Sequence, residues 1–282
     1  MLIDKNHSLL RDNTFHIDQK CDEYVAFANV SEAIDLAMNL KEPYLLLGGG
    51  SNLLLTSDFH GKVVTPEKRF DIAVELRQGC NEPYLRCWAG TTFDDVVDYA
   101  VRHGYYGLEN LSLIPGECGA SAIQNIGAYG AEIKDVMLEV EAVEIGTGRV
   151  VRIKADDCGY AYRQSKFKNE WKDKYIVVYV TYKLSRVFKP ELDYGNIRKQ
   201  LADRGMEESQ LTGEVLRGII IDIRQSKLPD PSVKGNAGSF FMNPIVDGSE
   251  FDRLKKSHPD LRYFEVPQPD GETKYKIPAG WM

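Results

Sequence analysis

The sequence predicts a mixed α+β protein built from two or three domains. Its 282 residues are more than one average hydrophobic core organises. Several segments alternate apolar and polar residues with the period of a half-buried strand, and others repeat at helical spacing. Hydrophobic residues make up 43% of the chain, which is ordinary for a folded globular protein.

Residues 14–65 predict a small unit that combines a helix with strands. Ser31 is placed to cap a helix whose apolar face is formed by Ile34, Ala37 and Met38. Residues 44–47 then form a short apolar run that predicts a buried strand.

The strand at 44–47 leads into Gly48-Gly49-Gly50-Ser51-Asn52, followed by Leu53. Such a loop presents several backbone N–H groups in one concavity, which binds phosphate, although a plain glycine turn has the same composition. A Rossmann fold is excluded because Leu53 stands where the third glycine is required and no amphipathic helix follows. Residues 56–61 predict a turn instead.

The next part of the chain predicts an alternating series of strands and helices. A helix begins after Gly90-Thr91-Thr92, carries two aspartates in its first turn and ends at Gly104. A second helix covers residues 213–226. Strands are expected at 71–76, 84–89, 138–145, 149–153 and 175–184.

Residues 114–130 are unusually rich in small residues, with four glycines and a single charged residue, Glu117. A core helix rarely carries so many glycines. We interpret this stretch as a backbone surface that lies against a large flat ligand. A tight connection between two packed elements is the alternative.

Composition excludes several classes of function. The net charge is −7, which argues against general nucleic-acid binding. Five scattered cysteines, one of them Cys118, fit a reducing cytoplasm, and the N-terminus has no signal-peptide pattern. No apolar run is long enough to span a membrane, and no cluster has the spacing of metal ligands.

Two further segments are candidates for function. Residues 160–168 are aromatic and basic, which predicts either a solvated turn or a local cationic patch for an anion. Ser239 lacks the surroundings of a nucleophile, so a role as a hydrogen-bond or proton donor stays open. A polar shift near residue 68 and the prolines after Lys227 place domain boundaries. We expect domains at 1–68, 69–226 and 227–282.

Six segments of the chain form a distinctive series, namely 48–54, 107–110, 114–116 with 124–130, 162–168, 227–231 and 235–244. Taken in this order, they resemble the UDP-N-acetylenolpyruvoylglucosamine reductase (MurB) family. Tyr194-Gly195 is similar to the tyrosine loop of the type I members of that family.

The resemblance implies an FAD-binding fold of the vanillyl-alcohol-oxidase and MurB type, together with a smaller substrate-binding domain. FAD would bind non-covalently between the first two domains. The residues implied to bind it are Gly48, Gly49, Gly50, Ser51, Asn52, Leu53, Pro115, Gly116, Ser121, Asn125, Ile126 and Gly127.

The resemblance also implies an activity, in which NADPH reduces UDP-N-acetylglucosamine enolpyruvate to UDP-N-acetylmuramate through FAD, for peptidoglycan synthesis in a monomeric cytoplasmic enzyme. Arg163 would steady the developing enolate and Ser239 would protonate it. Substrate would be held by Tyr129, Tyr194, Lys227 and Asn243.

One departure concerns the C-terminal region. The family continues past the Gly-Trp segment into a Leu-Glu-Pro-Glu-like motif that carries a catalytic glutamate, whereas this sequence stops at Met282 and Glu265 does not match that context. We expect FAD binding with severely impaired turnover. The rival interpretations are another flavin oxidase of the same fold, tethering FAD through Cys118, and a non-catalytic nucleotide-sugar binding protein.

Overall fold

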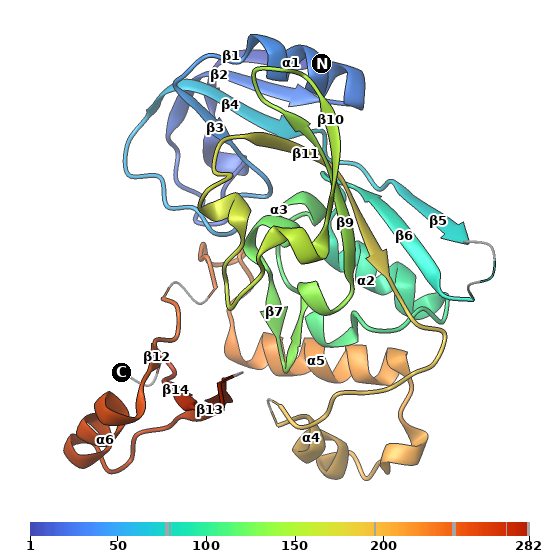
Figure 1. Cartoon of the computed structure of the whole chain (residues 1–282), viewed down its shortest axis with the longest axis vertical. Helices are drawn as coiled ribbons and strands as arrows, with labels where there is room; N and C mark the ends of the chain where they lie inside the picture. The colour runs from blue at the N-terminus through green and yellow to red at the C-terminus, as the bar shows by residue number, and fades with distance from the viewer. Residues whose placement is uncertain (77–78, 80, 195, 239–240, 269, 281–282) are drawn as a thin grey trace. The chain divides into compact units, whose positions relative to one another are not determined.

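The computed structural model describes the chain except residues 77–78, 80, 195, 239–240, 269 and 281–282. The chain divides into two compact units, Met1–Asn236 and Ala237–Met282 (Figure 1). Each unit has its own sheet structure and its own hydrophobic core.

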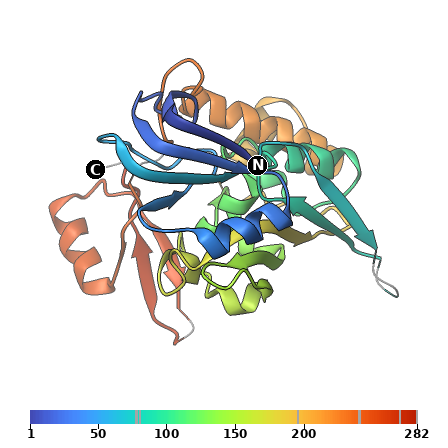
Figure 2. The same cartoon turned by 90° about the horizontal axis from the view of Figure 1, so that it is seen from above.

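The first unit begins with a four-stranded sheet in the order β1-β2-β4-β3, whose strands lie alongside one another in Figure 2. Strands β2 and β3 run parallel to β4, and β1 pairs with β2 antiparallel. The elements are β1 (Leu2–Ser8), β2 (Lys20–Phe27), helix α1 (Val30–Asn39), β3 (Tyr44–Leu46) and β4 (Phe59–Pro66).

Two details of this region differ from the sequence prediction. Helix α1 is capped by Asn29, whose side chain accepts a hydrogen bond from the Glu32 N–H, so the expected cap at Ser31 is wrong. The turn expected at 56–61 is also wrong at its end, because β4 already begins at Phe59. Gly61 permits this pairing, since a Cβ there would lie 2.4 Å from the Pro43 carbonyl oxygen.

The second sheet is antiparallel in the order β10-β9-β11-β6-β5. Its five strands confirm the five expected from alternation, to within one or two residues. They are β5 (Ile72–Leu76), β6 (Pro83–Trp88), β9 (Met137–Glu144), β10 (Val150–Lys154) and β11 (Tyr175–Lys183).

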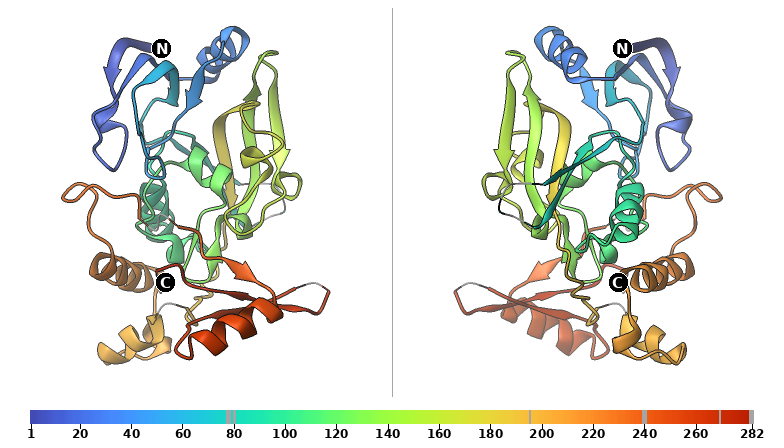
Figure 3. Two further views of the ribbon diagram at one scale, coloured as in Figure 1. Left: turned by 90° about the vertical axis from the view of Figure 1, so that its left-hand side faces the viewer. Right: turned by 90° about the vertical axis from the view of Figure 1, so that its right-hand side faces the viewer.

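Helix α1 lies between the two sheets (Figure 3). Its buried residues Ala33, Leu36 and Ala37 share one core cluster with Phe27 of β2 and Val178 of β11. The two sheets are therefore joined by a common hydrophobic core, and the expected boundary at 68/69 falls in the polar connection between β4 and β5. The three-domain division stays a prediction.

The helices of the second region pack on the sheet and on one another. Helix α2 buries the apolar face that the sequence predicts. On its other side, Arg217 of α5 donates hydrogen bonds from Nη1 and Nη2 to the two carboxyl oxygens of Asp94, at 2.7 and 2.9 Å. The helices are α2 (Phe93–Arg102), α3 (Cys118–Gln124), α4 (Ile197–Asp203) and α5 (Gly213–Lys227).

Helix α3 lies inside the stretch 114–130, where no helix was expected. That expectation is wrong because only Gly119 of the four glycines is within the helix. Glycine at position 119 allows the helix to pack closely on Ala89, since a Cβ on Gly119 would lie 3.0 Å from the Ala89 Cβ. Burial of Cys118 and Ala122 against the second sheet outweighs the intrinsic cost of one glycine, about 1 kcal/mol.

Short elements complete the first unit. A two-stranded hairpin, β7 (Gly127–Ala128) and β8 (Ala131–Glu132), follows α3. The 3-10 helices are η1 (Leu9–Arg11), η2 (Glu109–Leu111), η3 (Ile133–Asp135), η4 (Ala155–Cys158), η5 (Lys166–Lys168) and η6 (Glu208–Gln210).

The second unit is a three-stranded antiparallel sheet in the order β12-β14-β13 with one helix. Its small core contains Phe251, Leu261 and Ile277, and the ring of Phe251 stacks on Tyr275 with centroids 3.9 Å apart. The elements are β12 (Ile245–Val246), α6 (Gly248–Ser257), β13 (Phe264–Pro267) and β14 (Thr273–Lys276).

Candidate functional site

The two glycine-rich loops that the sequence singles out are in direct contact. The Ser51 hydroxyl donates to the Pro115 carbonyl oxygen at 3.2 Å, and the Asn52 amide donates to Gln124 Oε1 at 2.7 Å. A Cβ added to Gly49 would lie 3.3 Å from the Gly116 Cα. Residues 48–52 and 115–117 therefore form one surface, which we call the glycine cradle.

The backbone of the cradle requires glycine at two positions. Gly50 has φ of +63°, and a Cβ there would lie only 1.9 Å from the Asp12 carbonyl oxygen. Gly116 has φ of +115°, and a Cβ there would lie 3.1 Å from the Ser51 hydroxyl oxygen. The cradle therefore offers a backbone surface with few side chains, which suits a ligand that contacts main-chain groups.

Glu117 places an unpaired carboxyl group in the cradle. Its side chain is buried, with the residue 5% exposed, and neither carboxyl oxygen has a hydrogen-bond partner in the described part of the chain. Burial raises the pKa of Glu117 to about 7, Lys68 opposes the rise and Asp12 adds to it. Orphaned buried oxygens are costly unless a ligand satisfies them, so the cradle fits a polar group such as a dinucleotide.

The remaining predicted cofactor residues are placed in two ways. Leu53 packs against the hydrophobic core of the first sheet. The side chains of Ser121, Asn125 and Ile126 turn into the protein, where Ser121 Oγ donates to the Cys118 carbonyl at 2.7 Å and contacts the Tyr182 hydroxyl at 2.8 Å. Any contact from these residues to a cofactor must therefore use the backbone.

The turn that carries Arg163 is held against the end of the same stretch. Ser165 Oγ donates to the Ile123 carbonyl at 2.6 Å, and the Asn125 amide donates to the Ala161 carbonyl at 2.8 Å. Arg163 has φ of +57°, and its Nη2 donates to the Gly127 carbonyl at 2.8 Å. Residues 114–130 thus contact the first glycine loop at one end and Arg163 at the other.

Arg224 of α5 lies beside Arg163 and Tyr129 and was missed by sequence reasoning. Burial lowers the pKa of Arg224, the Tyr129 hydroxyl and Asp94 oppose this change, and the charge of Arg163 lowers the pKa further. Its Nε is buried and has no hydrogen-bond partner among the described residues. Two arginines with mutual repulsion and an open donor are suited to an anion.

The substrate residues expected in the first unit lie near this arginine pair or on its helix. Burial raises the pKa of Tyr129, and Arg224 opposes that rise. Tyr194 lies next to Gly130, where an added Cβ would be 3.5 Å from the Tyr194 Cβ. Lys227 is the exposed last residue of α5, and its position one turn after Arg224 is the signal that could have found Arg224.

Two predicted residues belong to the second unit. Ser239 lies outside the described residues. Asn243 is half-buried, and its Oδ1 accepts a hydrogen bond from the Ala279 N–H at 2.9 Å. This bond fixes the Asn243 side chain within the second unit.

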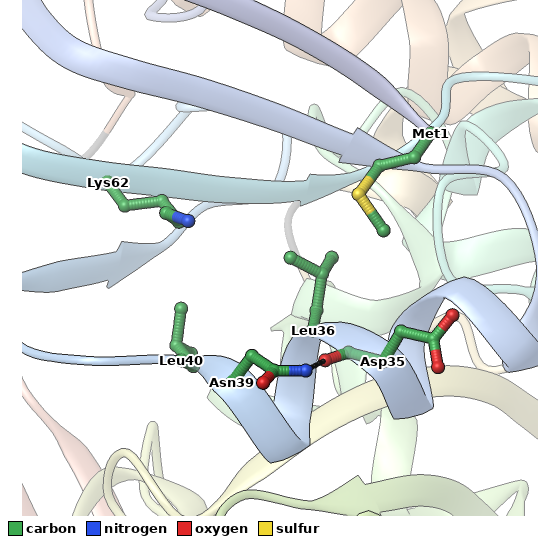
Figure 4. A pocket seen from close by; sticks show the side chains of 6 residues that line it. All are labelled: Met1, Asp35, Leu36, Asn39, Leu40 and Lys62. Atoms are coloured by element: carbon green, nitrogen blue, oxygen red, sulfur yellow. Dashed lines mark hydrogen bonds between the residues drawn. The ribbon is translucent and has the colours of Figure 1, made fainter.

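One pocket in the described part of the chain is lined by residues outside the cradle. A pocket of about 220 Å³ is lined by Met1, Asp35, Leu36, Asn39, Leu40 and Lys62 (Figure 4). Two of its charged groups are already paired, Lys62 with Glu23 at 2.7 Å and the amino terminus with Glu32 at 2.6 Å.

Cys118 is completely buried in the core beside Cys87, which does not favour a covalent flavin tether there. Within the described ranges, no cluster of three or more His, Cys, Asp or Glu residues is arranged to hold a metal ion. No helix in the part of the chain that the structure describes is long and apolar enough to cross a bilayer.

Comparison with known proteins places this site in context. Residues 27–154, which contain both loops of the cradle, match the FAD binding domain family. A solved MurB structure from Thermus caldophilus aligns with a TM-score of 0.59 at 20% identity, covering 99% of this chain and 89% of that one. The matched family and the shared fold define a protein with an FAD-binding domain, and the expected fold class is confirmed.

Curated relatives define the family more closely. UDP-N-acetylenolpyruvoylglucosamine reductase of Bacteroides fragilis (strain YCH46) is 43% identical over 99% of this chain and 82% of its own length. The protein of the same name from Flavobacterium johnsoniae is 40% identical over 100% of this chain and 82% of its own length. The chain belongs to the UDP-N-acetylenolpyruvoylglucosamine reductase family, and the expected resemblance is confirmed.

Proposed function

We propose that this chain reduces UDP-N-acetylglucosamine enolpyruvate to UDP-N-acetylmuramate with NADPH through non-covalent FAD, in the cytoplasm. The relatives named above are reductases of an enolpyruvoyl nucleotide sugar. The observation that carries the proposal is the pairing of a glycine cradle with two arginines at opposite ends of residues 114–130.

The cradle would hold the dinucleotide through its backbone. Residues 48–52 and 115–117 carry a single ionisable side chain, that of Glu117, so main-chain N–H groups rather than cations are the natural donors to a pyrophosphate. When bound, FAD supplies hydride transfer from NADPH to the enolpyruvyl group. The chain's contribution is to hold FAD next to the arginine pair, Arg163 and Arg224.

The arginine pair would stabilise negative charge on the substrate. Hydride addition to the enolpyruvyl group leaves enolate character beside its carboxylate. Arg163, held by the Gly127 carbonyl, and Arg224, with an open Nε, present planar donor groups to such an anion. A preorganised donor aimed at developing charge contributes about 100- to 1,000-fold to the rate.

The remaining substrate residues complete the proposed mechanism. Ser239 would donate a proton to the carbon that carries the developing charge, because a strongly basic carbon accepts a proton even from a hydroxyl. Tyr129, Tyr194, Lys227 and Asn243 would bind the nucleotide-sugar portion, with Lys227 acting as a point charge toward the diphosphate.

The proposal is tested by spectroscopy and rapid kinetics on the purified chain. We expect a visible flavin absorbance that leaves the protein on denaturation, bleaching with NADPH under anaerobic conditions, and recovery of colour when the enolpyruvyl substrate is added. In Arg163→Lys we expect colour recovery to slow about 100-fold while bleaching is unchanged. The exposed Arg152→Lys on β10 is the matched control.

Each other outcome of this experiment contradicts a part of the proposal. Colour that stays on the denatured chain would indicate a covalently bound flavin. A chain with no flavin absorbance that binds the nucleotide sugar would be a binding protein. Equal recovery rates in Arg163→Lys and the parent would remove Arg163 from the reaction.

A further inference from the structure

We propose that Glu117 is a hydrogen-bond ligand of the FAD pyrophosphate and binds it as the neutral carboxylic acid, so that the chain holds FAD more weakly as the pH rises. This inference rests on the FAD site proposed above. It gives a function to the only charged residue of the stretch 114–130.

The geometry places the Glu117 carboxyl group in the first glycine loop. A Cβ added to Gly48 would lie 3.5 Å from Glu117 Oε2, and a Cβ added to Gly49 would lie 3.8 Å from Oε1. The carboxyl group therefore borders the two residues that open the phosphate-binding sequence pattern. Although Glu117 is the N-cap residue of α3, its side chain makes no capping hydrogen bond.

The carboxyl group has no partner within the protein that explains its burial. Both oxygens are inaccessible and unpaired among the described residues. Native proteins rarely leave two oxygens of one buried side chain unsatisfied, and a site for a ligand or ion is a standard reason. An ionised carboxylate would accept hydrogen bonds only, whereas a neutral acid offers one O–H donor to a phosphate oxygen.

The titratable groups around Glu117 come from four other segments. Lys68, after β4, favours the ionised form, and Asp12, after η1, disfavours it. Tyr24 of β2 donates its hydroxyl hydrogen to Asp12 at 3.1 Å, and its pKa is raised by burial and by the charges of Asp12 and Glu117. His7 also contacts Asp12, at 2.9 Å. Because burial is the largest influence, the pKa of Glu117 lies at about 7.

The direction of the pH dependence follows from charge. The diester pyrophosphate of FAD stays anionic across neutral pH, so it repels an ionised carboxylate and favours the protonated one. Below the pKa of Glu117 the carboxyl is already neutral, and FAD binds at full strength. Above that pKa a proton must be taken up on binding, so the dissociation constant rises about tenfold for each pH unit.

The test measures FAD affinity of the flavin-free 282-residue chain between pH 6 and 9 by quenching of FAD fluorescence. For the parent we expect a flat dissociation constant below about pH 7 and a tenfold rise per pH unit above it. Glu117→Gln retains an N–H donor at the same place and should bind FAD with little pH dependence. An unchanged slope in this variant would overturn the proposal.

Glu109→Gln is the matched control. Glu109 is also a buried glutamate, and burial raises its pKa. One of its carboxyl oxygens has no partner among the described residues, and the other accepts a hydrogen bond from the Gly107 N–H at 2.8 Å. Glu109 lies in η2, outside the cradle. This variant should keep the slope of the parent. Loss of the slope in Glu109→Gln as well would refute an effect specific to Glu117.

Two further measurements keep the proposal falsifiable if Glu117→Gln folds poorly. Lys68→Met removes a charge that lowers the pKa of Glu117, so the rise in the dissociation constant should begin at higher pH; an unchanged onset contradicts the proposal. ADP-ribose, which has the pyrophosphate diester but no ribityl chain, should compete with the same pH dependence. Competition independent of pH would exclude the pyrophosphate as the partner.

Failure of this inference differs from failure of the FAD site itself. A parent chain that binds FAD equally well at pH 6 and 9 refutes only the role of Glu117. A parent chain that binds no FAD at any pH refutes the cradle as a cofactor site.

Discussion

Gly50 and Gly146 both adopt positive φ, at +63° and +89°, but only Gly50 is enclosed. A Cβ at Gly50 would overlap the Asp12 carbonyl oxygen, whereas no described atom lies within 4 Å of a Cβ at Gly146. We expect Gly50→Ala to lower the free energy of unfolding by about 3 kcal/mol or more and Gly146→Ala by about 1 kcal/mol. Urea unfolding measures the free energy of unfolding of both variants. Equal losses would show that the positive φ angle, and not the enclosure of Gly50, determines the cost of the substitution.

Glu117 also makes a prediction about the stability of the flavin-free protein. Its carboxyl ionises near pH 4.5 in the unfolded chain and at about 7 in the folded chain. Ionisation between these values favours the unfolded state, so stability is lost as the pH rises from 4.5 to 7 and stays lower above 7. Glu117→Gln removes this loss, worth about 3 kcal/mol.

Urea unfolding at pH 5 and pH 8 checks this prediction. We expect Glu117→Gln to gain stability over the parent mainly at pH 8. The exposed Glu170→Gln should show the same small change at both values. A constant difference between Glu117→Gln and the parent would contradict a raised pKa in the fold.

At the residue scale, sequence predicts positions that belong to a local pattern. Residues 48–52 and Arg163 stand in distinctive motifs, and the structure places both against residues 114–130. Arg224 and the burial of Glu117 could not be predicted, because each depends on neighbours distant in the chain, such as Arg163 and Gly48. No local pattern reports that a carboxyl group is buried without a partner.

Two glycines in helices make opposite predictions at the scale of the element. Gly119 in α3 packs on Ala89, while no described atom lies within 4 Å of a Cβ at Gly218 in α5. Gly119→Ala should destabilise the protein by about 1–2 kcal/mol, because overpacking exceeds the gain in helix propensity. Gly218→Ala should stabilise it by about 0.5–1 kcal/mol.

Thermal and urea unfolding of both variants measure this contrast. Stabilisation by Gly119→Ala would mean that α3 does not pack closely on the second sheet. Loss of stability in Gly218→Ala would mean that this face of α5 has a neighbour.

Elements with strong periodicity were the ones that sequence predicted. Helix α2 has an apolar stripe, two aspartates in its first turn and a glycine stop, and all three are observed. Strand β1 was not expected, because nearly all of its residues are exposed and its pairing with β2 supplies the stability that a buried face usually gives. Helix α3 was missed because its packing, not its composition, makes it helical.

At the scale of the whole molecule, every described contact of the cradle lies within Met1–Asn236. A chain ending after Asn236 keeps the hydrogen bonds from Asn236 to Thr14 and Pro229, at 2.9 and 3.0 Å. We expect it to bind FAD with an affinity within about threefold of the 282-residue chain, a change under 1 kcal/mol. It should lose substrate reduction, because Ser239 and Asn243 are removed.

Flavin absorbance after desalting and anaerobic reoxidation by the enolpyruvyl substrate separate these two properties. Loss of FAD from the shortened chain would show that Ala237–Met282 contributes to cofactor binding. Full reoxidation would remove the second unit from catalysis.

The residues between Gly116 and Gly127 connect the two proposed binding sites. One end of this segment borders the glycine loop after β3, and the other accepts the hydrogen bond from Arg163. If the cradle binds FAD and Arg163 binds the substrate, as proposed, the length of this segment sets the distance between flavin and substrate. An insertion or deletion inside it should then disturb both sites together, and we expect length variation among homologous chains to be confined to either side of it.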